Sequence, residues 1–167
     1  MSADKPVQPA PKPKLSRSRA RLEAVQALYQ MDLAQTDLAN VIEDFKSHRL
    51  EDTDEGAEAG SDLEEANPKH FAAVLKGVVR RQREIDPMVD TQLAEGWHLT
   101  RVDSTVRAIL RAGTFELMEL ADIPARVVIS EYVEVAKAFF EGDEPRLVNG
   151  VLDAIARKLR PGQLAER

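Results

Sequence analysis

The stretch that most constrains the fold of this chain runs from Ser16 to Leu33, SRSRARLEAVQALYQMDL. Its apolar residues recur at three- and four-residue steps, as in Val25, Leu28 and Tyr29. This spacing matches one face of an α-helix, so we expect a helix over residues 16–34 whose apolar face packs on a core. A chain that carries such a helix close to its N-terminus is expected to fold around it.

Three arginines, Arg17, Arg19 and Arg21, stand at the front of this stretch, where either Ser16 or Ser18 is a plausible N-cap. Residues 1–21 contain six basic residues and one acid, a local charge of +5, although the net charge of the chain is −6. A basic arm on an acidic body favours contact with a polyanion such as a nucleic acid. On charge alone, a solubilising tail explains the pattern equally well.

Composition limits the remaining possibilities. The chain has 167 residues, 43% of them hydrophobic and 5% aromatic, and contains no cysteine. This length predicts one compact domain or two small subdomains that share a core. Disulfides and zinc-thiolate sites are excluded, and the N-terminus lacks the apolar core of a secretory signal, so we expect a cytoplasmic protein.

The periodicity predicts helices along almost the whole chain and therefore an all-α fold. Residues 1–15 are rich in proline and lysine and are expected to form a disordered basic leader. Trp97 is expected to plug the seam between two helical layers. After the helix over 16–34, the expected helices cover 36–50, 68–86, 87–95, a stretch from Asp103 or Thr100 to about 121, 125–140 and 146–160. Gly113, inside the helix that ends at about residue 121, implies a close approach by another helix.

An acidic stretch interrupts the helices at residues 51–66. It holds eight acids, no base and only one sizeable apolar residue, Leu63. Such a segment cannot bury enough apolar surface to order itself, so we interpret it as an acidic surface insertion. An alternative is that it mimics RNA and competes for the basic arm.

The chain has no recognisable catalytic or metal-binding set. His48, His70 and His98 are isolated, and none forms a ligand pair at helical spacing. Nucleophile-elbow, phosphate-loop and dinucleotide-binding motifs are absent. Carboxylates cluster only on expected solvated helix faces and in the acidic stretch. We therefore expect a binding protein without cofactor or metal, and not an enzyme.

The best candidates for recognition are cations with suitable neighbours. The three arginines could contact phosphates, and Tyr29 could stack on an unpaired base, although a core tyrosine is comparably plausible. Arg146 and Asn149 lie near the start of the last expected helix, where backbone N–H groups also point outward.

Several motifs together resemble one family. They are RARLEAVQALYQ at 19–30, Trp97, RAILRAGTFEL at 107–117, the segment 124–137 that contains VVISEYVEVAK, and LVNGVLD at 147–153. In order and spacing they resemble the NusB family of bacterial transcription antitermination factors. The resemblance implies an N-terminal three-helix subdomain (about 16–96, with the acidic insertion 51–66) and a C-terminal four-helix subdomain (about 97–161).

The resemblance also implies partners. Family members bind the small-subunit ribosomal protein NusE, contact the single-stranded boxA segment of nascent ribosomal RNA, and join an RNA polymerase antitermination complex. They act by binding and catalyse nothing, and some form a homodimer when free.

Carried over by position, the family's RNA-binding residues fall at two places in this sequence. They are Arg17, Arg19, Arg21, Gln26 and Tyr29 in the first helix, and Leu147 and Asn149 in the last. Many members have Phe where this chain has Leu147, which removes one stacking ring. The NusE-facing surface falls on Arg107 and Arg111; Val106 replaces a common acid there, and Asp103 is a candidate substitute.

Two other readings remain. One is the NusB-like RNA-binding module of ribosomal RNA methyltransferases, which requires a downstream dinucleotide-type fold and a catalytic cysteine that this sequence lacks. The other is a helical adaptor that binds only protein; binding to a NusE homologue without binding to RNA would favour it.

Overall fold

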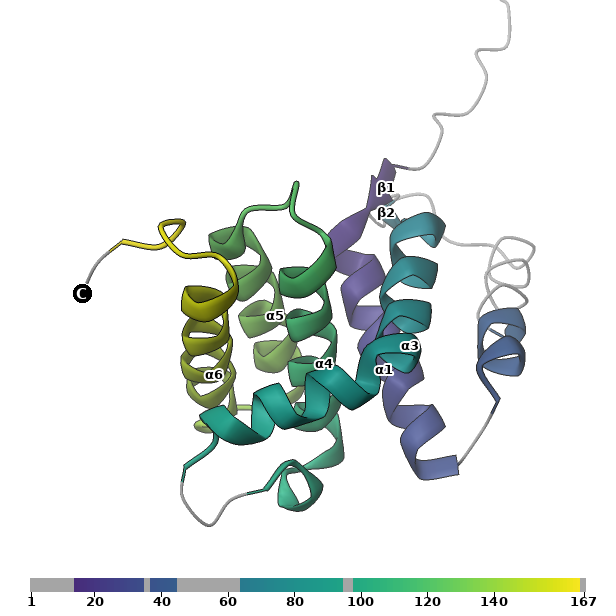
Figure 1. The fold of residues 1–167 in the computed structure, drawn as a ribbon. Coiled ribbons are helices and arrows are strands. Elements are labelled where there is room, and N and C mark those ends of the chain that lie inside the picture. Colours follow the sequence, from purple (N-terminus) through teal and green to yellow (C-terminus); the bar gives the residue numbers. More distant parts are fainter. Residues whose placement is uncertain (1–13, 35–36, 45–63, 95–97, 166–167) are drawn as a thin grey trace, which may run out of the picture.

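In a computed structural model, the described residues are 14–34, 37–44, 64–94 and 98–165. The prediction of an all-α fold is confirmed, with helices carrying nearly all of this part of the chain (Figure 1). The elements are β1 (Lys14–Ser16), α1 (Arg17–Ala34), a helix over residues 38–44, β2 (Glu64–Ala66), α3 (Pro68–Gln92), the 3₁₀ turn η1 (Leu99–Arg101), α4 (Ser104–Glu119), α5 (Ala125–Phe139) and α6 (Glu144–Leu159). None of these helices is long and apolar enough to cross a membrane.

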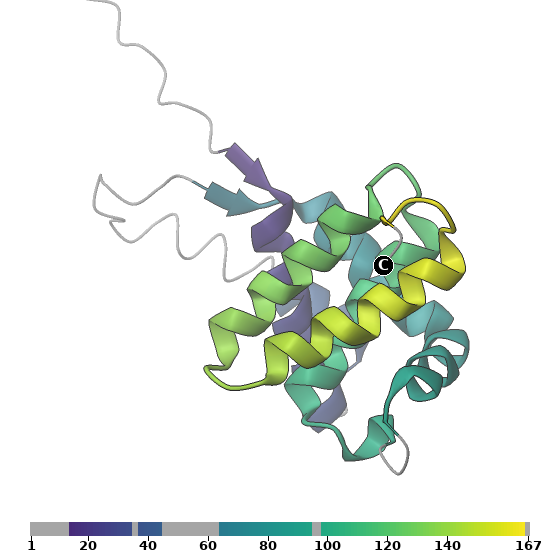
Figure 2. The ribbon, with the colours of Figure 1, turned by 90° about the vertical axis from the view of Figure 1, so that its left-hand side faces the viewer.

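A small parallel ladder joins β1 to β2, which the helical periodicity did not predict. Leu15 pairs with Glu65 and Ser16 with Ala66, and the Asn67 amide donates to the Ser16 carbonyl at 2.9 Å. The ends of the predicted leader and of the predicted acidic insertion are therefore ordered against each other. Figure 2 shows the two strands together at one edge of the helical body.

The ladder sets the starting points of two helices. The Ser16 hydroxyl accepts a hydrogen bond from the Arg19 amide at 3.0 Å, so Ser16, and not Ser18, is the cap of α1 among the two predicted candidates. The Asn67 side chain accepts from the amides of Lys69 and His70 at 3.0 and 3.1 Å. Because the two caps are held by neighbouring strands, α1 and α3 begin side by side.

α3 is a single helix through Pro87, so the prediction of a separate helix starting there is wrong. Proline inside a helix removes one N–H donor and clashes with the carbonyl four residues earlier, which bends the helix without necessarily ending it. Figure 1 shows this bend, after which α3 crosses beneath the other helices. The part of α3 after Pro87 packs into the core through Val89, which is 0% exposed. This burial outweighs the free-energy cost of a proline inside the helix.

α4 lies at the centre of the body and packs against α1, α3, α5 and α6. Two glycines allow these approaches. A Cβ on Gly113 would lie 2.8 Å from Leu152 Cδ1, which confirms the predicted close contact, and a Cβ on Gly77 would lie 2.1 Å from the Phe115 ring. The buried apolar residues form one continuous cluster from α1 to α6, so the two predicted subdomains share a core.

Candidate nucleic-acid interface

The first turn of α1 carries two of the three predicted arginines on its surface. Arg17 and Arg19 are both exposed. Arg17 lines a shallow pocket of about 230 Å³ together with Asn67 and Lys69 at the start of α3. Cations therefore gather where the N-termini of two helices, each a partial positive charge, lie next to each other.

Arg21 does not belong to this exposed group, and the prediction that it lies on the basic arm is wrong. Its residue exposure is 2%, and its guanidinium points into the body. Arg21 Nε donates to Glu116 Oε2 at 2.8 Å and its second terminal nitrogen donates to Oε1 at 3.0 Å. This bidentate pair fastens α1 to the central helix. Arg19 points to the opposite side of α1, whereas Arg21 lies on the same side as Arg17 but one turn further along the helix, where it meets Glu116 of α4.

Glu116 is the centre of a buried polar cluster that sequence reasoning missed. Its carboxylate also accepts from the Tyr132 hydroxyl, and His70 Nε2 lies 3.3 Å from Oε1. Burial alone would raise the pKa of Glu116, but contacts with His70 and Arg21 outweigh it and lower the pKa to about 2. Burial and the neighbouring Glu116 raise the pKa of Tyr132 well above its ordinary value. The cluster thus carries a permanent charge pair that ties together α1, α3, α4 and α5.

No sequence signal marked this cluster, because its members lie far apart in the chain. Arg21 and Glu116 are separated by 95 positions, and Glu116 stands alone in an apolar run. The expectation that carboxylates serve only solvated faces and the acidic insertion fails for Glu116, which is 0% exposed.

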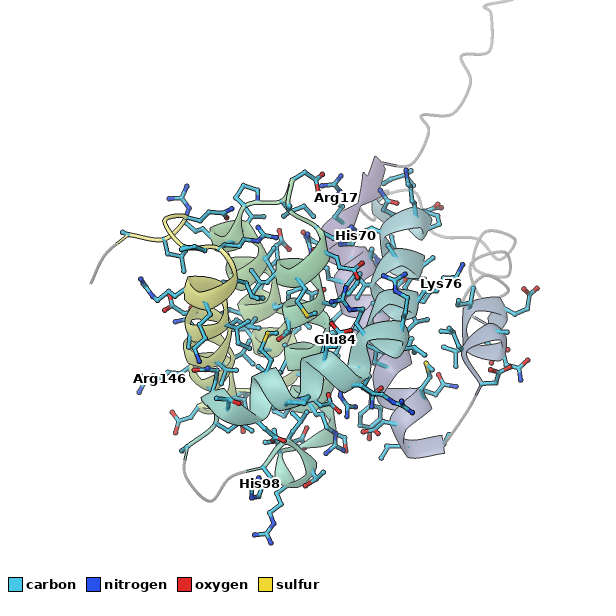
Figure 3. The ribbon with its side chains drawn as sticks, in the orientation of Figure 1. Arg17, His70, Lys76, Glu84, His98 and Arg146 are labelled. Carbon is cyan, nitrogen blue, oxygen red and sulfur yellow. The ribbon has the colours of Figure 1, made fainter. Side chains whose placement is uncertain are left out.

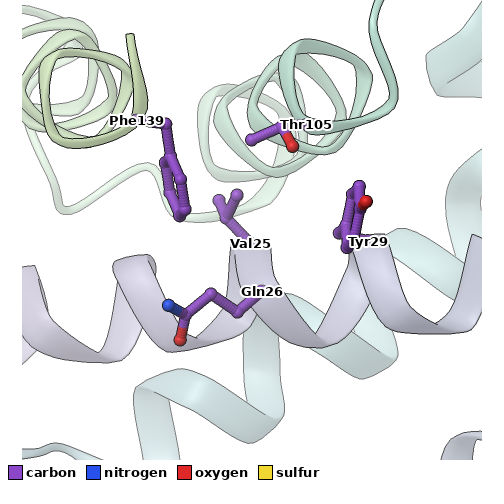
Figure 4. Close-up of a pocket in the computed structure, with 5 residues that line it drawn as sticks. All are labelled: Val25, Gln26, Tyr29, Thr105 and Phe139. Atoms are coloured by element: carbon purple, nitrogen blue, oxygen red, sulfur yellow. The ribbon is translucent and has the colours of Figure 1, made fainter.

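Gln26 and Tyr29 both line a surface pocket of about 360 Å³ between α1, α4 and α5 (Figure 4). Val25 forms its floor, and Thr105 and Phe139 complete its wall. Tyr29 is 39% exposed and Phe139 is 40% exposed, so each presents part of a ring to solvent. Tyr29 is therefore not a fully buried core residue, and Phe139 is an aromatic neighbour that sequence reasoning did not single out. Its only sequence signal was an aromatic pair, Phe139 and Phe140, at a helix end.

Arg146, Leu147 and Asn149 are exposed on the first turns of α6. Figure 3 places Arg146 by the start of α6, away from Arg17, which lies beside the strands. The structure thus does not bring the two predicted groups together. The pocket lined by Tyr29 and Phe139 lies toward the C-terminal ends of α1 and α5, nearer the start of α6 than Arg17 is.

The predicted partner-facing residues are mostly engaged inside the chain. Arg107 donates to Asp32 Oδ2 at 2.8 Å and to the Leu99 carbonyl at 3.0 Å. Arg111 forms a bidentate pair with Asp86, at 2.9 and 3.0 Å. These pairs tie α4 to α1 and α3 at the bend of α3.

The remaining two partner-facing predictions have different outcomes. Val106 is 1% exposed, so it cannot present a contact surface without local opening, because its side chain is part of the core. Asp103 is exposed and caps α4 through its Oδ1, which accepts from the Thr105 amide at 2.8 Å. Asp103 is thus the accessible member of the four.

Some predictions lie outside the described residues. They are the seam position of Trp97, the conformation of residues 1–13, most of the acidic insertion (51–63) and the ends of the helix expected over 36–50. A homodimer of the free protein likewise stays a prediction. Within the described residues, no group of three or more His, Cys, Asp or Glu side chains is placed to hold a metal ion.

Comparison with known proteins gives consistent matches over most of the chain. The NusB family model matches residues 18–157. A transcription antitermination protein NusB from Agrobacterium fabrum (strain C58) is 52% identical over 156 residues, which is 93% of this chain and 92% of that protein. The corresponding protein from Rhizobium etli (strain CFN 42) is 46% identical over 160 residues, 96% of this chain and 97% of that protein.

Solved structures agree with the fold. NusB of T. maritima superposes with a TM-score of 0.70 and 28% identity, covering 87% of this chain and 93% of that one. A crystal structure of the antitermination factors NusB and NusE in complex with double-stranded RNA matches with a TM-score of 0.66 and 25% identity, covering 85% of this chain and 96% of that chain.

These matches confirm the resemblance on which the sequence predictions rested and, with it, a role in transcription antitermination that involves no catalysis. The chain belongs to the NusB family of transcription antitermination proteins.

Proposed function

We propose that this protein binds single-stranded boxA-like RNA along α1, across the pocket lined by Gln26 and Tyr29, and acts together with a NusE-type ribosomal protein in an RNA polymerase antitermination complex. The observation that carries the RNA proposal is the pocket itself, which is lined by two part-exposed aromatic rings and by a glutamine. Support for the partners comes from the related NusB that was crystallised with NusE and RNA.

The pocket suits an unstacked base. Tyr29 and Phe139 offer ring faces on α1 and α5, and the Gln26 side chain offers one donor and one acceptor for a base edge. Stacking on an aromatic side chain contributes roughly 1–3 kcal/mol per base. The ring of Phe139 compensates for the ring that Leu147 lacks at the start of α6.

Phosphate contacts come from exposed cations on either side of this pocket. Arg19 and Gln26 are seven residues apart on α1 and so lie on the same helical stripe. Arg17 extends this basic surface toward the start of α3, and Arg146 extends it on α6. Arg21 is left out, because its charge is already paired with Glu116.

The NusE-type partner is proposed to dock around the start of α4. Asp103 is exposed there, as are His98 and Arg101 just before it. Arg107 and Arg111 support this surface from within through their pairs with Asp32 and Asp86. We propose them as residues that shape the partner surface and not as direct contacts.

RNA binding is tested by a salt titration with short labelled boxA RNA, with and without the partner protein. Replacing Arg17 and Arg19 by Ala removes two phosphate contacts, so the log–log salt slope should fall in magnitude by about 1.4, at roughly 0.7 per contact. Arg83→Ala, at an exposed arginine on α3, is the matched control and should leave the slope unchanged. An unchanged slope in the double variant would refute the assignment.

The stacking contact has a separate test. Tyr29→Leu should weaken RNA binding about tenfold or more, whereas Tyr29→Phe, which keeps the ring, should bind nearly as well as the native protein. Equal losses in both variants would show that the hydroxyl and not the ring makes the contact. Binding to the partner without RNA binding in any combination would instead favour the protein-only adaptor.

A further inference from the structure

The pocket lined by Gln26 and Tyr29 has a second polar wall residue, Thr105. Thr105 lies in the first turn of α4 and is half-buried, so its side chain can be reached from the pocket. Figure 4 shows this side chain directed from α4 toward α1, between the rings of Phe139 and Tyr29. The pocket therefore has polar groups from two different helices, with the aromatic rings on either side of Thr105.

The hydroxyl of Thr105 is free to bind a ligand. A threonine inside a helix often bonds through its hydroxyl to the carbonyl three or four residues earlier. For Thr105 these carbonyls belong to Arg101 and Val102, which precede α4. Among the described residues the hydroxyl has no hydrogen-bond partner, whereas the amide of Thr105 donates to Asp103 Oδ1 at 2.8 Å. The hydroxyl can thus both donate to and accept from a bound group.

The turn that carries Thr105 is held on both sides. Before it, Asp103 caps α4 through the bond to the Thr105 amide. After it, Arg107 donates to Asp32 Oδ2 through two nitrogens, at 2.8 and 3.1 Å. Asp32 lies three residues past Tyr29, so this pair joins α4 to α1 beside the pocket. A hydroxyl on such a fixed turn loses little conformational freedom when it binds a ligand.

We propose that Thr105 reads the RNA base that enters this pocket, through a hydrogen bond from its hydroxyl to the edge of the base. This inference rests on the RNA-binding function proposed for the pocket. A base that lies against the ring of Tyr29 or Phe139 turns its edge toward the wall between them, where Thr105 lies. Stacking tolerates every base, whereas hydrogen bonds to the base edge distinguish one base from another. Thr105 thus adds sequence preference to a contact that the rings make without it.

A double-mutant cycle between protein and RNA tests this contact in the full-length protein. Thr105→Val removes the hydroxyl but keeps the size and the β-branching of the side chain, and Thr105→Ser keeps the hydroxyl. Binding to a short single-stranded boxA RNA is followed by fluorescence anisotropy, with each nucleotide replaced in turn by an abasic one. Thr91→Val, at an exposed threonine of α3 outside the pocket, is the matched control. Circular dichroism melts check that each variant is folded.

We expect Thr105→Val to bind the intact RNA about three- to tenfold more weakly than the native protein, as for one neutral hydrogen bond. Thr105→Ser and Thr91→Val should stay within about twofold. At one abasic position, where Tyr29→Leu also has no further effect, Thr105→Val and the native protein should bind equally, because the base that the hydroxyl contacts is missing. At the other abasic positions the loss should persist.

Two outcomes overturn the role of Thr105. One is equal binding of intact RNA by Thr105→Val and the native protein. The other is a loss that persists at every abasic position, because the hydroxyl then contacts no base. If Thr105→Val melts below the assay temperature, Thr105→Ala takes its place in the same cycle. Failure of the RNA pocket itself is distinguishable, because Tyr29→Leu would then bind RNA as tightly as the native protein.

Discussion

Replacing Arg21 by Met should destabilise the fold strongly, although Arg21 belongs to a row of arginines that are otherwise exposed. Its side chain is 3% exposed and that of Glu116 is 0% exposed, and two hydrogen bonds of 2.8 and 3.0 Å join them. Met keeps the length of the aliphatic stem and its helix propensity but removes the charge. Glu116 would then be a buried carboxylate without its main counterion.

The expected loss can be estimated from these contacts. Removing one partner of a buried ion pair costs about 3–5 kcal/mol, because the other charge is left uncompensated. His70 and the Tyr132 hydroxyl still contact Glu116, so we expect about 3 kcal/mol. Out of a total stability of about 5–15 kcal/mol this is a large share, and it should lower Tm by about 6–12 °C.

Urea unfolding followed by circular dichroism measures this loss directly. The matched control is Arg19→Met, two residues earlier on the same helix and exposed, which should change stability by less than about 0.5 kcal/mol. The two variants should also differ in their affinity for RNA. Arg19→Met should lose affinity, whereas Arg21→Met should keep it under conditions in which it is folded.

A double-mutant cycle with Glu116→Gln tests the cause. Since the two side chains form one unit, the double variant should be less destabilised than the sum of the single losses, by about 2 kcal/mol. A loss below about 1 kcal/mol for Arg21→Met, or additive losses in the cycle, would refute the view that this pair anchors α1.

Two further predictions concern acid stability and helix contacts. The pKa of Glu116 is lowered from 4.5 to about 2, so its contribution of about 3 kcal/mol is present above pH 4.5 and is lost as pH falls toward 2. Acid titrations of unfolding should show this loss for the native protein and a flatter curve for Glu116→Gln; parallel curves would contradict it. Gly77→Ala should destabilise by about 2 kcal/mol because its Cβ meets the buried Phe115 ring, whereas Gly150→Ala, with no atom within 4 Å, should stabilise α6 by about 0.5–1 kcal/mol in thermal melts. Similar effects at the two glycines would mean that the contact at Gly77 relaxes freely.

Local periodicity predicted most of the helices because each amphipathic helix carries its own signal. The helix over residues 125–140 was recovered within one residue despite its β-branched residues, and Ser16, the cap of α1, was one of the two predicted candidates. The bend at Pro87 was misread as a boundary, because whether a proline ends or bends a helix depends on what the next turn packs against. The packing of Val89 decides that, and it is not visible in local sequence.

The sequence likewise predicted only part of the candidate site. Motifs in the sequence located Gln26 and Tyr29 and the family to which the chain belongs, but they could not show that Phe139 joins these two residues in one pocket. Nor could they separate Arg21 from Arg17 and Arg19. A run of alternating arginines looks uniform in sequence. Helix rotation of about 100° per residue turns Arg19 away from Arg21, but Arg17 and Arg21 share one face, and only the tertiary contact with Glu116 buries Arg21.

The sequence by itself determined the helical class, the family and the presence of a basic arm, because these depend on short-range periodicity and motif order. Only the tertiary structure decided which charged side chains are exposed and which are paired inside the fold. The pairing of Arg21 with Glu116 and of β1 with β2 joins residues about 50 to 95 positions apart, and such contacts form only when the folded core brings the elements together.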